Sequence, residues 1–565
     1  PQSDRSKTHL RPPKSAKCIL KGYSKTIAVI IGCLLISTGL SLCIPLLNRQ
    51  IMDEGFIGEN KSLLIELTLI LMAIYGINSI IDIIKEKKRV EISAKLQYFL
   101  SEQSFAHLMK MKMSYFNNTN YAELLNNINT DIGKMVMISD ESIFFVVTQT
   151  FNMIGGLIGL FIIDYRMSIL VIIFIPIKCI VMKYFAKKQK SIMEDFIRRN
   201  QEYAKWFGDT VEGIKEVKLF NIFDKKHNEF LIRQKGIIDK QKQMNMLSQW
   251  NIITDSIMVQ LLSTVLYIVG GSLVFDLQLS VGSVFAFITY SSYVTGPISA
   301  ILNIGYLLSG IIPSTKRYYE FMDLQEETES GKHLEPIFGE LRLQNVSFSY
   351  EVGKPVLRAI NLTFPKGSKT ALMGRNGSGK TTIINLLTRV YNPVSGYILL
   401  NETDISEISL HKYRNMVSVV SQQIYLFNDT IRNNICLYQN VSDEVIRAAC
   451  NESGLEDFLK EVSLDYVVGQ NGAMLSGGQK QKIALVRALV HDKPIIIFDE
   501  VTSNTDSYSE YQINNLLHTR LKNKTVIIIT HKREILSEVD RIIMLRDGIV
   551  VKNENYDELI GNSDE

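Results

Sequence analysis

Cysteine and net charge are both scarce in this chain of 565 residues. The six cysteines show none of the spacings that hold a metal ion, so we expect them to serve as small apolar fillers. A net charge of +4 is close to neutral for this length and gives no support for nucleic-acid binding. Low-complexity tracts and internal repeats are absent from the sequence as well. The cysteines are Cys18, Cys33, Cys43, Cys179, Cys436 and Cys450.

Long apolar runs are plentiful in the first half of the chain. With 46% hydrophobic and 21% charged residues, the chain is too long for one compact domain and too apolar for a wholly soluble protein. Six runs reach the roughly twenty apolar residues that cross a bilayer. One such run could be the core helix of a soluble protein, but six favour a membrane domain. The runs are 26–47, 63–84, 138–163, 167–185, 252–275 and 281–312.

Basic residues predict the orientation of these runs. Seven lysines and arginines precede the first run, and four more lie at 85–89, directly after the second. The positive-inside rule places both segments in the cytoplasm. The amphipathic stretches 86–137 and 186–251 are then cytoplasmic extensions of the helices. We therefore expect a multi-pass protein of the cell membrane with both termini in the cytoplasm and no cleavable signal ahead of the first run.

A glycine-rich loop at 374–382 carries the first chemical signal. It fits the pattern glycine, any four residues, glycine, lysine, then serine or threonine, between a strand-like run and a run that suits a helix. Backbone N–H groups of such a loop converge on phosphates, Lys380 adds a point charge, and Thr381 offers a hydroxyl to Mg²⁺. An ordinary glycine-rich turn is the alternative, and the complete pattern argues against it. The predicted ATP-binding residues are Gly374, Arg375, Asn376, Gly377, Ser378, Gly379, Lys380, Thr381 and Thr382.

Two adjacent carboxylates follow a second strand-like run. Residues 495–498 are apolar throughout, as in a strand buried on both faces, and they lead to Asp499 and Glu500. In an open parallel sheet the carboxyl end of such a strand borders the ligand crevice. We expect Asp499 to hold the metal and Glu500 to polarise the attacking water. A solvated acidic pair is the alternative.

Together these residues resemble the nucleotide-binding domain of an ABC transporter, from about residue 339 to the C-terminus. The resemblance implies an adenine-stacking role for Tyr350, a catalytic and metal-contacting role for Gln422, and a γ-phosphate contact for the catalytic His531. It also implies that the segment from Ser476 to Gln479 is the signature that completes the nucleotide site of a partner copy. The signature residues predicted to bind ATP are Ser476, Gly477, Gly478 and Gln479.

Two segments depart from the pattern of that family. Where the family usually has Ser-Ala-Leu-Asp after the catalytic glutamate, this chain has Asn504 and Thr505 in the middle positions, which puts the coupling between the two sites in doubt. Before the signature, Gln470 and Asn471 stand where Glu-Arg is common, so a contact with the membrane domain is expected to be weaker or rewired. The segment 212–220 resembles the second intracellular loop of the exporter branch, whose turn inserts into the opposite nucleotide-binding domain.

The resemblance implies a half-transporter of the exporter type. The expected fold is an α-helical transmembrane domain of six spanning helices with long cytoplasmic extensions, followed by an α/β P-loop ATPase domain with a helical subdomain. The expected divisions are 1–24, an N-terminal cytoplasmic segment; 25–324, the transmembrane domain; 325–338, a linker; and 339–565, the nucleotide-binding domain. Two identical chains are expected to form the working unit, with a heterodimer as the alternative. The expected cofactors are ATP and Mg²⁺.

The expected function is ATP-driven export from the cytoplasm by alternating access. The cargo predicted first is an amphipathic peptide, with multidrug or lipid export, including a flippase, as the alternative. Three further alternatives are disfavoured. The six runs argue against a soluble nucleic-acid ATPase, and the intact Glu500 and His531 argue against a nucleotide-gated channel. The fused spans with long cytoplasmic helices resemble exporters, whereas importers usually keep the two parts on separate chains. The residues expected near the cavity are mostly neutral, with Asp255 as the main charge. They are Thr148, Gln149, Asn152, Thr254, Gln260, Tyr267, Tyr293, Asn303 and Tyr306.

Overall fold

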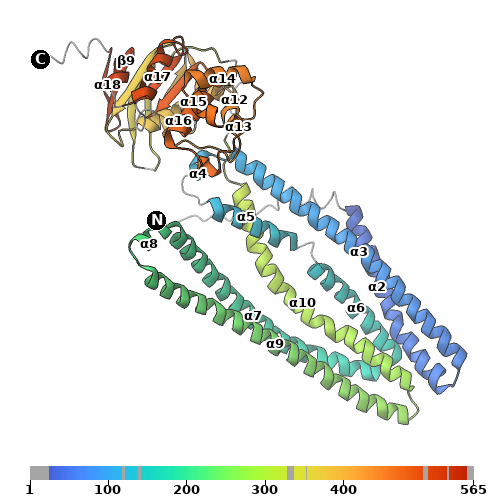
Figure 1. Ribbon diagram of the computed structural model, residues 1–565. Coiled ribbons are helices and arrows are strands. Elements are labelled where there is room, and N and C mark those ends of the chain that lie inside the picture. Colours follow the sequence, from blue (N-terminus) through green and yellow to red (C-terminus); the bar gives the residue numbers. More distant parts are fainter. Residues whose placement is uncertain are drawn as a thin grey trace. The chain divides into compact units, whose positions relative to one another are not determined.

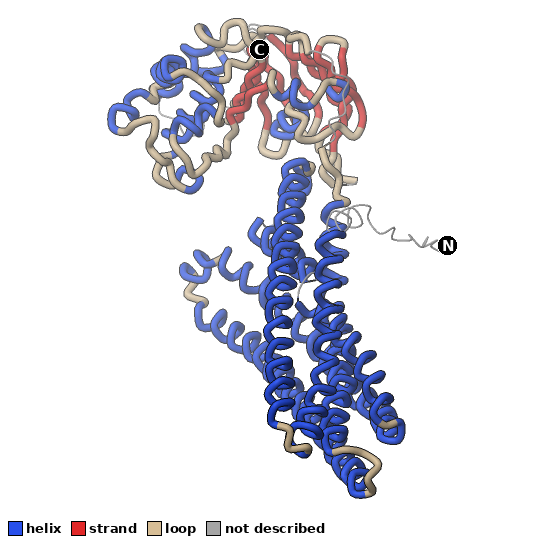
Figure 2. The backbone as a smooth tube through the Cα atoms, turned by 90° about the vertical axis from the view of Figure 1, so that its right-hand side faces the viewer, coloured by secondary structure: helices blue, strands red, loops and turns tan. Residues whose placement is uncertain are grey.

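The computed structural model describes residues 24–116, 121–137, 141–327, 336–351, 353–500, 507–530 and 533–555. The chain divides into two compact units, Pro1–Met109 with Asn120–Leu324, and Lys110–Thr119 with Gln325–Glu565. The first unit is helical, and the strands among the described residues lie in the second unit, as Figure 2 shows. The domain expectation differs in one respect: it placed residues 110–119 in the membrane domain.

The reason for that difference is a short backbone pairing. The Lys112 amide donates to the Gln325 carbonyl at 3.4 Å, and the Glu327 amide donates to the Lys110 carbonyl at 2.6 Å. The segment after α3 therefore pairs with the start of the expected linker, far away in sequence. Arg414 holds Glu327 by two hydrogen bonds of 2.9 and 3.0 Å, which fixes the linker start to the second unit.

The helices of the first unit are much longer than a bilayer is thick. Three of them, with 50, 48 and 53 residues, run unbroken from apolar into polar sequence. At 1.5 Å per residue each spans roughly 70–80 Å, against about 30 Å for the hydrocarbon core. The elements are α2 (Ser24–Gln50), η1 (Ile51–Ile57), α3 (Lys61–Lys110), α5 (Tyr121–Val136), α6 (Glu141–Ile163), α7 (Tyr165–Glu212), α8 (Ile214–Leu219), α9 (Phe223–Phe275) and α10 (Val281–Met322), as Figure 1 shows.

Five of the six expected spans are confirmed by length and composition. Among the described residues, the helices long and apolar enough to cross a membrane lie in 24–57, 61–110, 145–163, 165–212 and 223–275. The sixth expected span falls in α10, which is helical throughout but is not among those five. The side chains of residues 300 and 303–310 of α10 lie outside the described part of the chain, so this span stays a prediction. Serine, threonine and tyrosine residues lie between 289 and 295 of the same helix. Several of their hydroxyls donate to backbone carbonyls, including Tyr290 to Leu42 at 2.5 Å.

Glycines on α6 allow close packing around α10. A Cβ added to Gly159 would lie 2.6 Å from the Tyr290 ring, and one added to Gly156 would lie 3.0 Å from Val294. Small residues of this kind let two helices pack closely within a membrane, where the hydrophobic effect does not drive helices together. The buried core here contains Leu160 from α6 and Phe287 from α10.

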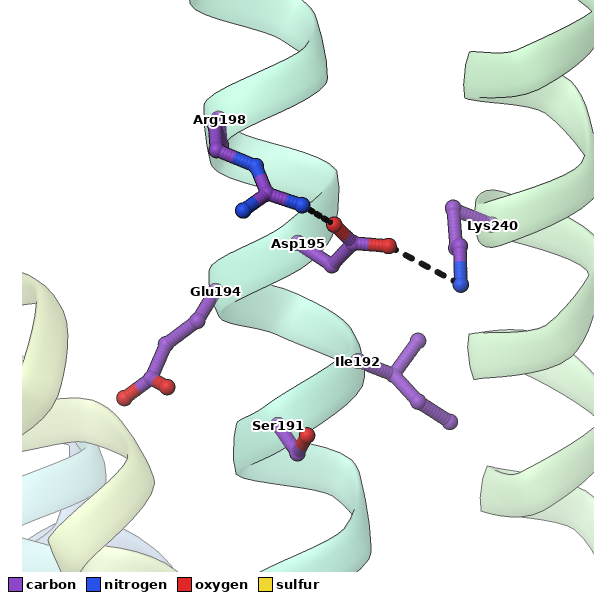
Figure 3. Close-up of a pocket in the computed structure, with 6 residues that line it drawn as sticks. All are labelled: Ser191, Ile192, Glu194, Asp195, Arg198 and Lys240. Atoms are coloured by element: carbon purple, nitrogen blue, oxygen red, sulfur yellow. Dashed lines mark hydrogen bonds and ion pairs between the residues drawn. The ribbon is translucent and has the colours of Figure 1, made fainter.

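An ion-pair cluster joins α7 to α9 beyond the apolar part of both helices. Asp195 on α7 contacts Lys240 on α9 at 2.9 Å and also pairs with Arg198. These residues line a depression of about 490 Å³, together with Ser191, Ile192 and Glu194, and Figure 3 shows Asp195 directed at both cations. Because the pair bridges two helices, it holds the two extensions together.

The second unit contains two sheets. The smaller has the order β2 (Leu357–Phe364), β1 (Leu341–Phe348), β4 (Ser395–Leu400), β5 (Thr403–Asp404) and is antiparallel. The larger has the order β10 (Ile549–Asn555), β9 (Arg541–Arg546), β3 (Lys369–Gly374), β8 (Thr525–Ile529), β7 (Ile495–Asp499), β6 (Val417–Val420) and is parallel except at β10. The helices are α4 (Met113–Phe116), α11 (Lys380–Leu387), η3 (Ile405–Glu407), α12 (Leu410–Arg414), α13 (Ile431–Cys436), α14 (Asp443–Glu452), α15 (Glu456–Glu461), η4 (Gln470–Gly472), α16 (Gly477–Val490), α17 (Ser507–His518) and α18 (Arg533–Leu536).

The large sheet is buried on both faces, which explains its unbroken apolar strands. On β7, Ile496 and Phe498 belong to the core shared with α13, α14 and α16. Ile495 and Ile497, with side chains on the opposite face, belong to the core shared with the small sheet and α11. This alternation follows from the two-residue period of a strand.

Candidate nucleotide site

The predicted loop and the predicted acidic pair lie at the same edge of the large sheet. Strands β3, β8 and β7 are parallel neighbours, and the register pairs both Leu372 and Asp499 with Ile529. The carboxyl ends of all three strands therefore meet at one edge, which is where open parallel sheets bind ligands. The loop leaves β3 at this edge, and Asp499 ends β7.

Gly374 and Gly379 fix the path of the loop. Gly374 has a φ of 153°, and a Cβ there would lie 2.4 Å from the Leu545 carbonyl oxygen. Gly379, with a φ of 104°, precedes α11, and a Cβ there would lie 2.5 Å from Leu357. Gly377 has a φ of 80° but faces open space. Steric contacts within the fold thus require glycine at positions 374 and 379. Gly377 has no such contact, so the loop is open at that position.

Lys380 and Ser378 are buried polar residues of the loop. Lys380 Nζ donates to the carbonyl oxygens of Gly374 at 2.6 Å and Arg375 at 3.2 Å. Burial lowers the pKa of Lys380, although the negative charges of Glu500 and Asp499 oppose the shift. The Ser378 hydroxyl is buried without a hydrogen-bond partner among the described residues. Thr381 is exposed. The loop therefore holds a buried cation and a buried hydroxyl that lack an anionic partner within it.

Asp499 and Glu500 occupy different environments although they are adjacent. Asp499 is 9% exposed, and its pKa is raised by burial first and by the charge of Glu500 second. Glu500 has a φ of 53°, a strained backbone for a residue with a side chain. Its amide donates to the Ile529 carbonyl at 3.1 Å, which holds the turn beside β8. Because the chain turns at Glu500, the two adjacent carboxylates lie in different surroundings.

Gln422 lies next to this acidic pair. Its side-chain Nε2 donates to Glu500 Oε2 at 2.6 Å, across a sequence distance of 78 residues. Gln422 follows β6, the strand beside β7, so the sheet order explains the meeting. The structure thus brings together Lys380, Asp499, Glu500 and Gln422 as the sequence predicted.

Tyr350 lies on the other side of α11. Its hydroxyl is 3.2 Å from Thr382 Oγ1, and it accepts a hydrogen bond of 3.3 Å from Asn385. The ring is half-exposed and packs edge-to-face on Tyr391, with centroids 5.2 Å apart. Sequence reasoning missed the supporting roles of Asn385 and Tyr391. Asn385 lies three residues after Thr382 on α11, so the helical period could have predicted that both side chains lie on the same face.

The signature begins a helix and faces solvent. Ser476 is the N-cap of α16: its hydroxyl accepts from the Gln479 amide at 3.3 Å, and Gln479 Oε1 accepts from the Ser476 amide at 2.8 Å. This reciprocal pair is a capping box. Gly477 and Gly478 face open space. Among the described residues, no hydrogen bond joins this segment to the loop at 374–382.

Asn471 forms part of the turn before the signature. It has a φ of 50° and lies between Gly469 and Gly472, which also have positive φ. Its carbonyl accepts from Lys480 Nζ at 2.8 Å, and its side chain accepts from the Leu426 amide at 3.4 Å. Asparagine is one of the few residues with a side chain that tolerates this conformation. His531, Asn504 and Thr505 lie outside the described residues.

Comparison with known proteins matches both units of the chain. Residues 27–298 match the family described as ABC transporter transmembrane region, and residues 357–503 match the family described as ABC transporter. An ATP-dependent lipid A-core flippase of Salmonella typhimurium (strain LT2) is 30% identical over 519 residues, 91% of this chain and 89% of that protein. The chain belongs to the ABC transporter family. An ATP-dependent lipid A-core flippase of Pectobacterium atrosepticum is 31% identical over 95% of this ABC transporter and 92% of that protein.

A solved structure has the same fold as this ABC transporter. A bacterial Atm1-family ABC exporter with ATP bound superimposes with a TM-score of 0.79 and 21% identity, over 96% of each chain. The ABC transporter is thus a multi-pass membrane protein whose transmembrane region and ATPase domain are fused in one chain. It is an ATP-dependent exporter, as predicted from the sequence.

Proposed function

We propose that this ABC transporter moves a lipid-like amphiphile across the membrane. The supporting observation is its similarity to lipid A-core flippases over about nine tenths of the chain, membrane unit included. The sequence alone put an amphipathic peptide first and a lipid second, and the similarity favours the second.

The proposed nucleotide chemistry follows from the site. The loop at 374–382 cradles the phosphates, and Lys380 exchanges its contacts with Gly374 and Arg375 for phosphate oxygens. Tyr350 stacks on the adenine ring. Glu500 orients the attacking water and accepts its proton once Gln422 releases it. His531 contacts the γ-phosphate and stabilises the charge that develops there.

The residues present fit Mg²⁺. A hydroxyl on Thr381, the amide oxygen of Gln422 and the buried carboxylate of Asp499 are the hard oxygen ligands that Mg²⁺ takes, with the remaining positions left to phosphates and water. Burial first and the charge of Glu500 second raise the pKa of Asp499, so a bound cation would stabilise its ionised form. Bound Mg²⁺ would offset the charge on the β- and γ-phosphates.

Two chains are proposed to form the working unit, with each signature completing the other's site. Ser476, Gly477 and Gly478 stand exposed at the positive end of α16, where backbone N–H groups bind phosphate. Lys380, Glu500, His531 and the signature are all intact in this chain, so two copies would form two complete sites and favour a homodimer. We also propose that the ATPase domain and both termini lie in the cytoplasm, since the basic residues flank the spans on that side.

ATP binding at two such sites is sufficient to drive alternating access. A ligand at about a hundredfold over its Kd favours the bound state by ~2.7 kcal/mol. Two sites supply ~5.4 kcal/mol, close to the ~5.5 kcal/mol that swings a two-state equilibrium from 1:99 to 99:1. Hydrolysis removes the ligand that bridges the chains and resets the transporter.

Transport by purified protein in proteoliposomes tests the cargo. ATP should drive a fluorescent lipid from one leaflet to the other, measured by the fraction that a membrane-impermeant quencher bleaches. The Glu500→Gln variant is the control for leak. ATP-dependent uptake of amphipathic peptides, with no movement of any lipid, would refute the proposal.

A further inference from the structure

Two oppositely charged side chains meet within the apolar part of the helical unit. Lys178 comes from α7 and Asp255 from α9, and the ammonium lies 2.8 Å from Asp255 Oδ1. The Lys178 side chain is fully buried, whereas the Asp255 side chain is 29% exposed. Ionisable groups within a membrane are costly, so they mark functional sites more often than accidental ones.

The carboxylate uses only one of its two oxygens. Ser299 on α10 donates to the same Oδ1 at 2.9 Å, so both partners of Asp255 contact a single atom. Among the described residues, no partner contacts Oδ2. A carboxylate has about four acceptor positions, and a purely structural pair in an apolar setting would be expected to fill them. Asp255 thus combines partial exposure with an oxygen that no described residue contacts.

A second unfilled acceptor lies one turn away on the same helix. The Oδ1 atom of Asn251 is buried and has no hydrogen-bond partner among the described residues. Asn251 and Asp255 are four residues apart, so their side chains lie on the same face of α9. Two adjacent acceptors, one of them charged, match a ligand that carries a positive charge and several N–H donors.

The position of the pair along the helices suits a lipid headgroup drawn into the protein. Lys178 is thirteen residues beyond Tyr165, where α7 begins, which corresponds to roughly 20 Å along the helix. Asp255 is twenty residues before Phe275, where α9 ends, which corresponds to roughly 30 Å. The pair therefore lies between the interior of the bilayer core of about 30 Å and its boundary on the side of the long extensions. An amphiphile could therefore keep its chains in lipid while its headgroup reaches Asp255.

We propose that Asp255 and Asn251 form a recognition site for an amphiphile with a primary ammonium headgroup. The inference rests on the proposed export of amphiphiles and names the headgroup. Lys178 and Ser299 are positioning residues: both contact Oδ1, which leaves Oδ2 for the ligand.

The test uses the homodimer in nanodiscs with three probes that share one alkyl chain: stearylamine, stearyl alcohol and stearyl sulfate. Binding of each probe is measured directly, and stimulation of ATP hydrolysis is measured in parallel. The protein should bind stearylamine at least about tenfold more tightly than stearyl alcohol, and Asp255→Asn should remove that preference. Asp82→Asn, which removes an exposed carboxylate on α3 bonded to Lys85, is the matched control and should keep the preference.

A charge exchange separates recognition from structure. In the double variant Lys178→Asp with Asp255→Lys the ion pair is restored, but the exposed member is now cationic. The proposal predicts a preference for stearyl sulfate in this variant, whereas a purely structural pair predicts no change in preference. If the exchange does not fold, Asp255→Asn decides by itself.

The two proposals fail in different ways. A preference for stearylamine that survives Asp255→Asn, or equal binding of all three probes by the unmodified protein, would overturn the headgroup assignment. Equal stimulation of hydrolysis by all three probes would leave amphiphile export intact. If lipids and these probes neither stimulate hydrolysis nor move across the membrane, the proposed function itself is refuted, whatever the binding assay reports.

Discussion

The hydrogen bond between Gln422 and Glu500 keeps the proposed base occupied in this state of the protein. Gln422 Nε2 lies 2.6 Å from Glu500 Oε2, so the amide and the attacking water compete for the same carboxylate. At the scale of single residues, we therefore expect bound nucleotide to rearrange this pair.

Glu500→Gln should abolish hydrolysis and preserve ATP binding. An amide has nearly the same shape as the carboxylate but cannot accept the proton, and loss of a general base costs roughly 10²–10⁴-fold in rate. Phosphate release and the Kd for ATP should be measured on the same preparation. A variant that hydrolyses ATP at a rate within tenfold of the unmodified protein would remove Glu500 from its assigned role.

Asp499→Asn should stabilise the protein when nucleotide is absent. The pKa of Asp499 is raised in the folded state from its ordinary value of 3.8, so the folded protein binds this proton more tightly than the unfolded chain. Stability therefore falls as pH rises from the ordinary carboxyl range through the raised pKa, and the ionised group is unfavourable at neutral pH. The variant, which is always neutral, should melt a few degrees higher at pH 7.

Melting temperatures measured between pH 4 and 8 test whether stability falls as pH rises. Asp457→Asn is the matched control, because Lys460 lowers the pKa of that exposed carboxyl and its removal should give no stabilisation. Mg²⁺ with ATP should raise the melting temperature of the unmodified protein more than that of Asp499→Asn. A lower melting temperature for nucleotide-free Asp499→Asn would contradict the burial argument.

At the scale of elements, α16 combines two functions at one residue. The Ser476 hydroxyl caps the helix, and the same hydroxyl is proposed to contact the γ-phosphate bound by a partner chain. Capping satisfies a backbone amide within the chain, whereas the phosphate contact needs the other chain. Substitutions that preserve one of these functions can therefore separate them.

Ser476→Asp should retain stability and lose activity. Aspartate caps helices as well as serine does, but its charge repels phosphate in the partner's site. Ser476→Ala should lose about 1 kcal/mol of stability because no side chain then caps α16. Denaturant unfolding together with ATPase rates distinguishes the two variants. An active Ser476→Asp protein would show that the hydroxyl does not approach the γ-phosphate.

Local patterns in the sequence predicted the elements well, because those elements depend on local periodicity. The apolar run at 495–498 became β7, and the glycine pattern placed α11 at Lys380. Contacts between distant segments were not predictable in this way. The pairing of Lys112 with Gln325 and the support of Tyr350 by Tyr391 depend on how elements meet in space.

At the scale of the whole molecule, the proposed nucleotide site is divided between two segments of the chain. The loop at 374–382 and the exposed signature at Ser476 are not joined by a hydrogen bond among the described residues, so a second copy is proposed to join them. The central claim is therefore the exchange of signatures between two identical chains. It predicts that the nucleotide site forms only between chains.

Disulfide cross-linking between two differently tagged chains tests this claim most directly. With the native cysteines replaced, one chain carries Asn376→Cys in the loop and the other carries Gly477→Cys in the signature. ATP should give a cross-linked product that contains both tags and has twice the 64.2 kDa mass of one chain. Each singly substituted chain alone should give no such product. A chain that carries both substitutions provides the opposite test. If it cross-links within itself and keeps the mass of a single chain, the exchange of signatures is contradicted.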